Sequence, residues 1–142
     1  MNPPTIRKVL SANDSGETGA HQAGILIPRD RRILSFFPAL PESELNPRAH
    51  ILFEDCAGHR WKFAFIYYNN RRFRGTRDEY RLTRMTRYIR EAGLSSGDEI
   101  ILHRDGQGDY SIEHRYAVNL SDALDAEPGF LRLSGGWRVI NF

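Results

Sequence analysis

Short apolar runs, separated by turns rich in glycine and polar residues, alternate along this chain of 142 residues. Two pairs of runs predict β-hairpins: residues 49–55 and 59–68 flank the turn CAG, and residues 98–105 and 109–118 flank GQG. TIRKVL, AGILIP, FLRLS and WRVIN predict further strands, because each is a short apolar run bounded by polar residues, glycine or proline. Most of the chain is therefore expected to form β-sheet.

Two short segments carry a helical pattern instead. Apolar residues recur at i, i+3, i+4 and i+7 from Met85 to Ala92, and Thr83 can cap the first turn, which predicts a helix over 84–92. The segment 29–37 predicts a second short helix, which a following proline ends.

The order of these segments indicates the fold class. About seven short strands, mostly in hairpins, and two short helices predict a mostly β, α+β domain with a small open barrel. The segment 11–21 is predicted to be a loop, and 38–47, with three prolines, is expected to be irregular. Because 142 residues suffice for one core and not for two, residues 1–142 are expected to form a single domain.

Composition excludes several classes of protein. Apolar residues make up 40% of the chain and charged residues 27%, which is ordinary for a globular domain. No apolar run approaches the roughly 18 residues of a membrane span, and the N-terminus lacks a secretory signal. Cys56 is the only cysteine, so an intramolecular disulfide is impossible, and we expect a buried free thiol in a cytoplasmic protein.

Arginine dominates the positive charge. Eighteen of the twenty basic residues are arginine, whose planar guanidinium pairs bidentately with phosphate or guanine. A GC-rich genome would also favour arginine, but residues 71–90 alone hold eight arginines and two acids, a local charge of +6. The whole chain carries only +2. Such a concentrated basic segment indicates a surface that binds nucleic acid.

Catalytic motifs are weak by comparison. Common magnesium-dependent nucleases carry Glu-x-Lys or Asp-x-Lys, and neither Lys8 nor Lys62 has an acid two residues before it. Glu54, Asp55 and His59 leave open a self-contained metal-dependent hydrolase, although one loose cluster lacks the ligand count that a metal needs. We expect no catalytic residue, metal or cofactor in this chain.

Two acids interrupt the arginines in TRDEYR (76–81). If this stretch is extended, Arg77, Glu79 and Arg81 share one face at spacings of about 6.6–6.8 Å, close to two base-pair steps. Arginine reads guanine through O6 and N7, and a carboxylate accepts from cytosine N4. The three residues are therefore candidate base contacts in a G·C-rich major groove.

A second interpretation of this stretch is a solvated helix N-terminus with internal ion pairs, in which Glu79 would point away from both arginines. Neighbouring residues are candidate contacts to the DNA backbone. The alternative is turn capping for the two asparagines and a solvated helix face for the last arginine. These residues are Asn69, Asn70, Arg71, Arg72, Arg74, Tyr80 and Arg84.

The polar loop over 11–22 is a second candidate surface. Its compact hydrogen-bonding side chains lie among glycines, so the loop can approach a groove closely. A flexible surface turn is the plainer alternative. Candidate base contacts are Asn13, Asp14, His21 and Gln22, and candidate backbone contacts are Ser11 and Thr18.

These two stretches resemble a known family. SANDSGETGAHQAGILIP (11–28) and IYYNNRRFRGTRDEYRLTR (66–84) resemble the two DNA-contacting segments in the effector-binding domain of EcoRII-type (type IIE) restriction endonucleases. AGLSSGDEIIL (92–102) is similar to a passage of plant B3 transcription factors, which share that fold. Tyr80 and Gly75 depart from the EcoRII pattern, which has lysine at both positions.

The resemblance implies a seven-stranded open pseudobarrel with two short helices, which grips the major groove of double-stranded DNA with two arms. We call residues 11–22 the first arm and residues 69–84 the second arm. Members read a GC-flanked pseudopalindrome of the CCWGG kind as monomers, and their reading positions fall here on Arg77, Glu79, Arg81 and His21.

In such enzymes this domain does not cut DNA; it controls a separate, magnesium-dependent catalytic domain that follows it in cis. The resemblance thus implies the N-terminal part of a longer restriction endonuclease in a prokaryotic cytoplasm. A stand-alone transcriptional regulator on the same fold is the alternative.

Overall fold

The computed structural model describes residues 4–16, 24–117, 130–132 and 136–140. Its strands form one nine-stranded sheet in the order β2-β5-β4-β3-β7-β6-β1-β9-β8. The strands are β1 (Thr5–Val9), β2 (Ile25–Ile27), β3 (Arg48–Glu54), β4 (Arg60–Tyr68), β5 (Glu79–Thr83), β6 (Glu99–Arg104), β7 (Tyr110–Arg115), β8 (Phe130–Arg132) and β9 (Trp137–Ile140). The short helices are α1 (Ala12–Ser15), α2 (Arg31–Leu34), α3 (Thr86–Glu91) and the 3-10 turn η1 (Asn70–Phe73).

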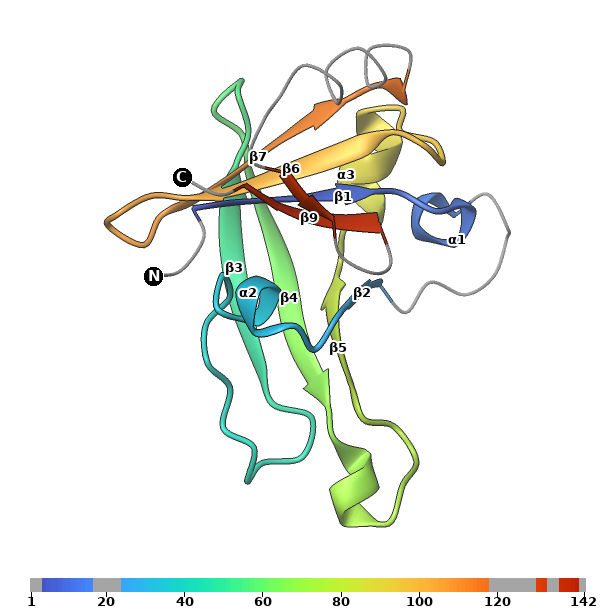
Figure 1. Cartoon of the computed structure of the whole chain (residues 1–142), viewed down its shortest axis with the longest axis vertical. Helices are drawn as coiled ribbons and strands as arrows, with labels where there is room; N and C mark the ends of the chain where they lie inside the picture. Colours follow the sequence, from blue (N-terminus) through green and yellow to red (C-terminus); the bar gives the residue numbers. More distant parts are fainter. Residues whose placement is uncertain (1–3, 17–23, 118–129, 133–135, 141–142) are drawn as a thin grey trace.

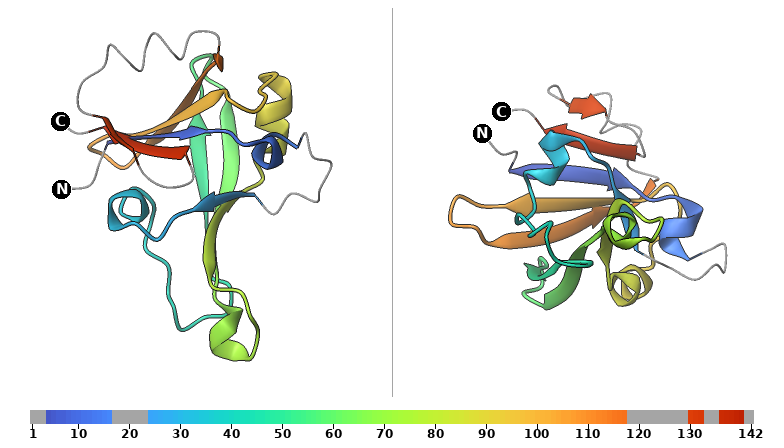
Figure 2. Two further views of the ribbon diagram at one scale, coloured as in Figure 1. Left: turned by 45° about the vertical axis from the view of Figure 1, so that its right-hand side comes forward. Right: turned by 90° about the horizontal axis from the view of Figure 1, so that it is seen from below.

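The sheet curls into an open barrel, because β1, β6 and β9 run across the direction of β3, β4 and β5 (Figures 1 and 2). Both predicted hairpins are confirmed, since β3 pairs antiparallel with β4 and β6 with β7. The two halves join where β3 pairs in parallel with β7, at Phe53–Tyr110 and Glu54–Ser111. The predicted mostly β, open pseudobarrel is confirmed, with nine strands in the described part of the chain instead of about seven.

One apolar core fills the curled sheet. Burial of aromatic and branched side chains from both halves supplies the main stabilising term. The largest fully buried side chains include Ile6, Phe36, Phe53, Phe63, Phe65, Leu82 and Trp137. The indole Nε1 of Trp137 donates to the Leu26 carbonyl oxygen at 3.0 Å, which ties β9 to β2 and closes the barrel beside the first arm.

The helices are shorter than the sequence pattern predicts. The helix predicted over 29–37 shrinks to α2, where Asp30 accepts hydrogen bonds from Arg32 that hold the pKa of its carboxyl at about 2. Thr83, predicted as the cap of α3, ends β5 instead and donates its hydroxyl to the Ala64 carbonyl oxygen. Within the described part of the chain, we find no helix that could span a membrane.

Two local predictions were wrong. Residues Ala12–Ser15 were predicted as loop but form a helical turn, because the side chains of Ser11 and Asp14 bond each other's backbone amides in a capping box. Cys56, expected to be buried, is exposed in the β3–β4 turn. The Asp55 carboxylate accepts hydrogen bonds from the backbone amides of Ala57 and His59. These bonds hold the turn, which therefore does not require Cys56 to be buried.

Candidate nucleic-acid interface

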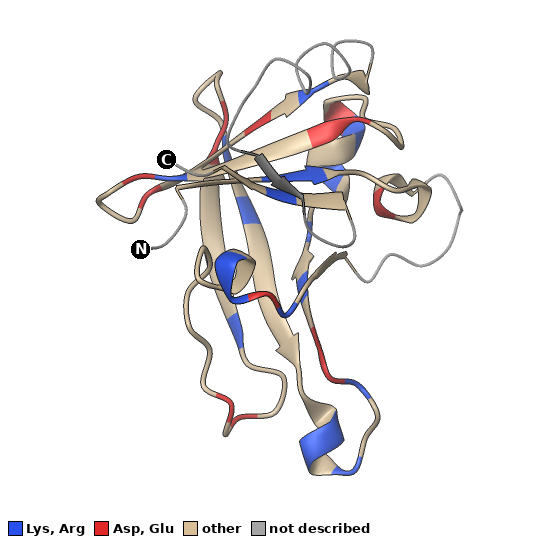
Figure 3. Cartoon of the chain, viewed as in Figure 1, with Lys and Arg blue, Asp and Glu red and all other residues tan. Residues whose placement is uncertain are grey.

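The second arm projects from the sheet as an extension of the β4–β5 hairpin, with η1 at its end (Figure 1). Basic residues cover this end, and an acidic segment follows on the way into β5 (Figure 3). The arm is closed by local bonds: Asn70 Oδ1 accepts from the Arg77 amide at 2.7 Å, and the Arg71 amide donates to the Arg77 carbonyl at 3.0 Å. Arg74 turns the chain with a φ of 75°.

Arg77, Glu79 and Arg81 lie together on one face of this arm. Glu79 Oε1 accepts from Arg77 Nη2 at 2.8 Å and from Arg81 Nε at 3.0 Å, so one carboxylate bridges two guanidinium groups. β5 begins at Glu79 and pairs with β4. The helical alternative is therefore wrong, and the extended conformation that places the three side chains side by side is confirmed.

The electrostatics keep this triplet ionised. The hydrogen bond from Arg81 is the largest cause that lowers the pKa of Glu79, and the bonds from Arg77 lower it further, against the opposing effect of burial. The side chains remain partly exposed, at 38% for Arg77, 28% for Glu79 and 19% for Arg81. A charged, fixed and accessible row of donors and acceptors can form directional hydrogen bonds with base edges.

Arg81 also contacts the residue that precedes β2. Its Nη1 donates to the Gly24 carbonyl oxygen at 2.9 Å. One hollow is lined both by Arg81 and by the first-arm residues Ser11, Asn13 and Asp14. The described residues of the first arm therefore border the same hollow as Arg81 of the second arm.

Three candidate contacts of the first arm lie in its described part. Asn13 is exposed. The Asp14 carboxylate accepts from the Ser11 amide and lies 3.3 Å from Lys8 Nζ, with 9% of its side chain exposed. These contacts give Ser11 and Asp14 a role in folding the arm, so the structure does not favour Asp14 as a base contact. Thr18, His21 and Gln22 lie outside the described residues.

Three residues of the second arm that were predicted to contact the DNA backbone make contacts within the domain itself. Asn69 is 0% exposed, and its amide group bonds the Asn46 amide and the carbonyls of Glu42 and Glu44. Asn70 holds the turn, which is the capping alternative. Tyr80 points to the other face of β5, where its ring stacks on Tyr67 at 4.3 Å. The prediction that Asn69 contacts phosphate is therefore corrected, because this residue is fully buried, whereas the backbone contacts of Asn70 and Tyr80 stay predictions.

The remaining basic residues of the arm are open to solvent. Arg71, Arg74 and Arg84 are exposed, and Arg72 is about half exposed, 3.2 Å from an equally exposed Glu42 carboxylate. Such exposed ion pairs are weak, so Arg72 can exchange this partner for a phosphate. These four arginines remain candidate backbone contacts.

Sequence reasoning missed two supports of the triplet. Arg29 donates to the Asp78 carboxylate and to the Tyr67 hydroxyl, which fixes the start of β5 from the opposite face. Tyr68 stacks beneath Arg77, whose Cζ lies 3.7 Å from the ring centroid. The first contact joins residues far apart in sequence and leaves no local signal, whereas the tyrosine pair YY at the end of β4 was visible.

Comparison with known proteins decides the family. The model of the N-terminal domain of the restriction endonuclease EcoRII matches residues 5–121, which is most of the chain. The chain belongs to the EcoRII N-terminal domain family. The family predicted from the two arm stretches is thereby confirmed.

Relatives of this EcoRII N-terminal domain occur in bacteria and plants. It is 44% identical over 82 residues to the type II restriction enzyme EcoRII of Escherichia coli, covering 54% of this chain and 20% of that enzyme. It is 28% identical over 131 residues to a B3 domain-containing protein of Oryza sativa subsp. japonica, covering 91% of this chain and 28% of that protein. The chain thus spans less than a third of the length of either curated relative.

A solved structure shares the fold. The Arabidopsis FUS3–DNA complex has a TM-score of 0.60 and 26% sequence identity to the EcoRII N-terminal domain, covering 78% of this chain and 95% of that chain. Likeness to both a restriction enzyme and plant B3 proteins is consistent with one pseudobarrel that serves different full-length proteins.

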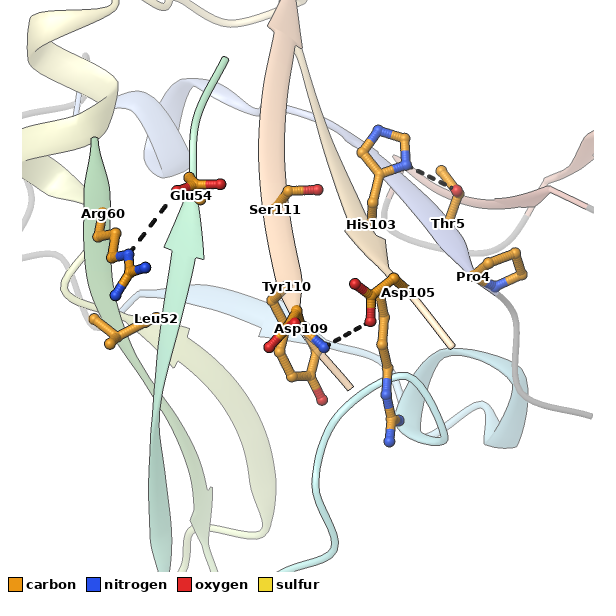
Figure 4. Close-up of a pocket in the computed structure, with 11 residues that line it drawn as sticks. Pro4, Thr5, Leu52, Glu54, Arg60, His103, Asp105, Asp109, Tyr110 and Ser111 are labelled. Carbon is orange, nitrogen blue, oxygen red and sulfur yellow. Dashed lines mark hydrogen bonds and ion pairs between the residues drawn. The ribbon is translucent and has the colours of Figure 1, made fainter. Parts of the chain in front are cut away.

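The alternative metal site of the EcoRII N-terminal domain is not assembled. Glu54 lines a hollow to which β1, β3, β4, β6 and β7 contribute residues, and it lies 3.9 Å from Arg60 (Figure 4). Asp55 and His59 line a different hollow, and the Asp55 carboxylate accepts from Trp61 Nε1. The described residues contain no cluster of three or more His, Cys, Asp or Glu that could hold a metal ion. The geometry therefore gives no support to a self-contained hydrolase.

Proposed function

We propose that this domain recognises a short GC-flanked pseudopalindrome of the CCWGG kind in the major groove of double-stranded DNA, as the targeting domain of a type II restriction endonuclease. Membership of the EcoRII N-terminal domain family and likeness to a DNA-bound B3 domain support DNA recognition. The second arm presents the reading face, and the first arm reads the other half of the site.

One observation carries the proposal: a carboxylate held between two guanidinium groups on the exposed face of a projecting strand. A surface that only gripped phosphates would repel them with Glu79. A surface that reads G·C pairs uses both charges, because guanine offers acceptors at O6 and N7 and cytosine offers a donor at N4. Arg71, Arg72, Arg74 and Arg84 supply sequence-independent attraction.

Selection from random duplexes tests this function. The purified domain is expected to enrich one short motif with G·C pairs at its ends, and a variant with Arg77→Ala is expected to enrich it less. Recovery of unenriched duplexes at every salt concentration, with the wild-type domain folded, would reject sequence-specific recognition.

The finer role rests on the EcoRII relatives. We propose that residues 1–142 are a single effector domain in a longer type IIE-like enzyme of a prokaryotic cytoplasm. The domain binds one target copy as a monomer, and a nuclease domain in cis cuts with Mg²⁺. A full-length protein of this kind should cleave a one-site plasmid faster when a short duplex carrying the site is added.

A stand-alone transcriptional regulator is the second candidate, favoured by the match to plant B3 proteins over 91% of the chain. A full-length protein that represses a promoter containing the selected site, without cutting it in the presence of Mg²⁺, would support regulation. In both roles DNA binding needs no metal, and affinity is expected to be unchanged by EDTA.

A further inference from the structure

Tyr68 makes a closer cation–ring contact than other pairs in the described residues. The Arg77 guanidinium carbon lies 3.7 Å from the Tyr68 ring centroid, which is van der Waals stacking distance. The other pairs, made by Arg29, Arg87 and Arg104, lie 5.6 to 5.9 Å apart. The Arg77 guanidinium group therefore lies in close contact over the face of the Tyr68 ring.

The sheet register explains why this ring lies under the triplet. Tyr68 is the last residue of β4 and stands directly opposite Glu79 of β5. Residues directly opposite on antiparallel strands point to the same face. Tyr67, one residue earlier, points to the other face and stacks on Tyr80. Only the second tyrosine of the pair can support the triplet.

Hydrogen bonds to Glu79 restrain the same guanidinium group along one edge. Arg77 Nε and Nη2 donate to Glu79 Oε1 at 3.2 and 2.8 Å. Its Nη1 and the second hydrogen of Nη2 make no hydrogen bond to the described residues. They form the terminal edge that can pair with guanine O6 and N7.

Arg81 has fewer donors to spare. Its Nε and Nη2 bond Glu79, and its Nη1 bonds the Gly24 carbonyl oxygen. It is also the less exposed of the two arginines, at 19% against 38%. Arg77 is therefore the arginine of the triplet that is best placed to read a guanine, and its orientation matters most.

We propose that Tyr68 is a positioning residue that sets the base specificity of the second arm by stacking under Arg77. With the ring below and Glu79 on one edge, the terminal edge of Arg77 points in a single direction before DNA arrives. Without the ring, only the hydrogen bonds to Glu79 restrain the guanidinium group, so the side chain gains freedom and loses more conformational entropy when it is ordered on DNA. This inference rests on the proposed DNA-reading function.

Tyr68→Leu and Tyr68→Phe distinguish the effect of the aromatic ring under Arg77 from the effect of side-chain volume alone. Binding is measured to the selected duplex and to the same duplex with the guanine pair exchanged. Tyr68→Leu should lower the ratio of the two affinities by roughly 3- to 30-fold, the range expected for a lost cation–π contact. Tyr68→Phe keeps the aromatic face and should keep the ratio. Tyr116→Leu, at an exposed tyrosine away from the arm, is the matched control.

The salt dependence of binding distinguishes positioning from a phosphate contact. The slope of log affinity against log salt should be the same for wild type and Tyr68→Leu, because no cation is removed. A shallower slope in Tyr68→Leu, or an unchanged affinity ratio, would overturn the proposal. If Tyr68→Leu does not fold, Tyr68→Val, which suits a strand, takes its place in the same comparison.

A measurement without DNA tests the stack by itself. The Nε–H signal of Arg77, identified by its loss in Arg77→Lys, should be displaced by the ring current in wild type and Tyr68→Phe but not in Tyr68→Leu. An undisplaced signal in wild type would also overturn the proposal. If the wild-type domain shows no preference between duplexes but the displacement is present, the proposed function fails while the stack stands.

Discussion

Glu79 is the residue on which the second arm is organised. Its carboxylate accepts hydrogen bonds from Arg77 and Arg81, and among the described residues its Oε2 receives only the bond of 3.3 Å from Arg81 Nη2. That oxygen retains a lone pair for a cytosine N4 donor. An acid among arginines thus has two compatible tasks, ordering the guanidinium groups and accepting from a base.

Acidification should remove the ion pairs between Glu79 and the two arginines. The pKa of Glu79 is lowered from its ordinary value of 4.5 in the folded domain, chiefly by the Arg81 hydrogen bond. A lowered folded pKa means that its contribution to stability is complete above the unfolded value and is lost as pH falls through the folded one. The difference in unfolding free energy between wild type and Glu79→Gln should therefore be constant above about pH 5 and shrink below about pH 4.

Denaturant titrations at several pH values measure this difference. Glu44→Gln, at an exposed glutamate in the neighbouring loop, is the control and should show a smaller difference. If the difference in unfolding free energy between wild type and Glu79→Gln grows as the pH falls, the triplet is not ion-paired in the way described.

At the scale of elements, the loop over 42–46 is hydrogen-bonded to the first residue of the second arm. Asn69 makes four hydrogen bonds with this loop through its side chain and its backbone amide. Since Asn69 is fully buried, Asn69→Ala leaves the carbonyls of Glu42 and Glu44 and the Asn46 amide without this partner. We expect a loss of about 1–3 kcal/mol in unfolding free energy or more.

Thermal or denaturant unfolding measures this cost. Ser43→Ala, at an exposed serine in the same loop, should cost much less. Equal stability of Asn69→Ala and wild type would show that the loop does not depend on this residue.

Gly24 directly precedes β2 and packs closely against β5. Its φ is +92°, and a Cβ there would lie 2.6 Å from the Leu82 carbonyl oxygen and from Thr83 Cγ2. Gly24→Ala should therefore push β2 away from β5 and break the Arg81 bond to the Gly24 carbonyl. It should lower both stability and DNA affinity.

Gly58→Ala is the matched control for this close approach. Gly58 has a similar φ of +86°, but no atom lies within 4 Å of the position that a Cβ would take there. The substitution should cost only the left-handed backbone penalty of about 1–2 kcal/mol and leave DNA affinity intact. Unfolding and binding are measured on both variants, and equal effects of the two would argue against a role for the contact with β5.

An element could be predicted from the sequence when the interactions that form it join residues close together in the chain. The β3–β4 and β6–β7 hairpins were predictable because alternation and turn residues are local signals. α1 was readable too, since Ser11 and Asp14 have capping-box spacing. The shortening of α2 was not, because Phe36 and Phe37 leave the helix to enter the core.

The same rule applies to the site. Arg77, Glu79 and Arg81 were predictable because strand alternation alone places them on one face. The burial of Asn69 depends on a loop more than twenty residues away, and the Arg29–Asp78 contact joins residues 49 positions apart. Neither contact has a signature in the sequence.

For the whole molecule, the proposed function assigns non-specific attraction and base specificity to different residues of the same arm. Arg74→Ala should weaken binding to all duplexes alike and reduce the salt slope by about one, because one phosphate contact is lost. Titrations of the selected duplex and an unrelated duplex at several salt concentrations measure this. A change in the preference between the two duplexes would instead make Arg74 a reader of bases.

The most direct test of the reading triplet is the affinity of wild type, Glu79→Ala and Arg77→Ala for every single-base-pair variant of the selected duplex. Glu79→Ala should lose discrimination most strongly at one C·G pair, and Arg77→Ala at a nearby guanine, each by about 1–3 kcal/mol. Profiles that fall uniformly at all positions, or that keep the wild-type discrimination, would contradict base reading by this face.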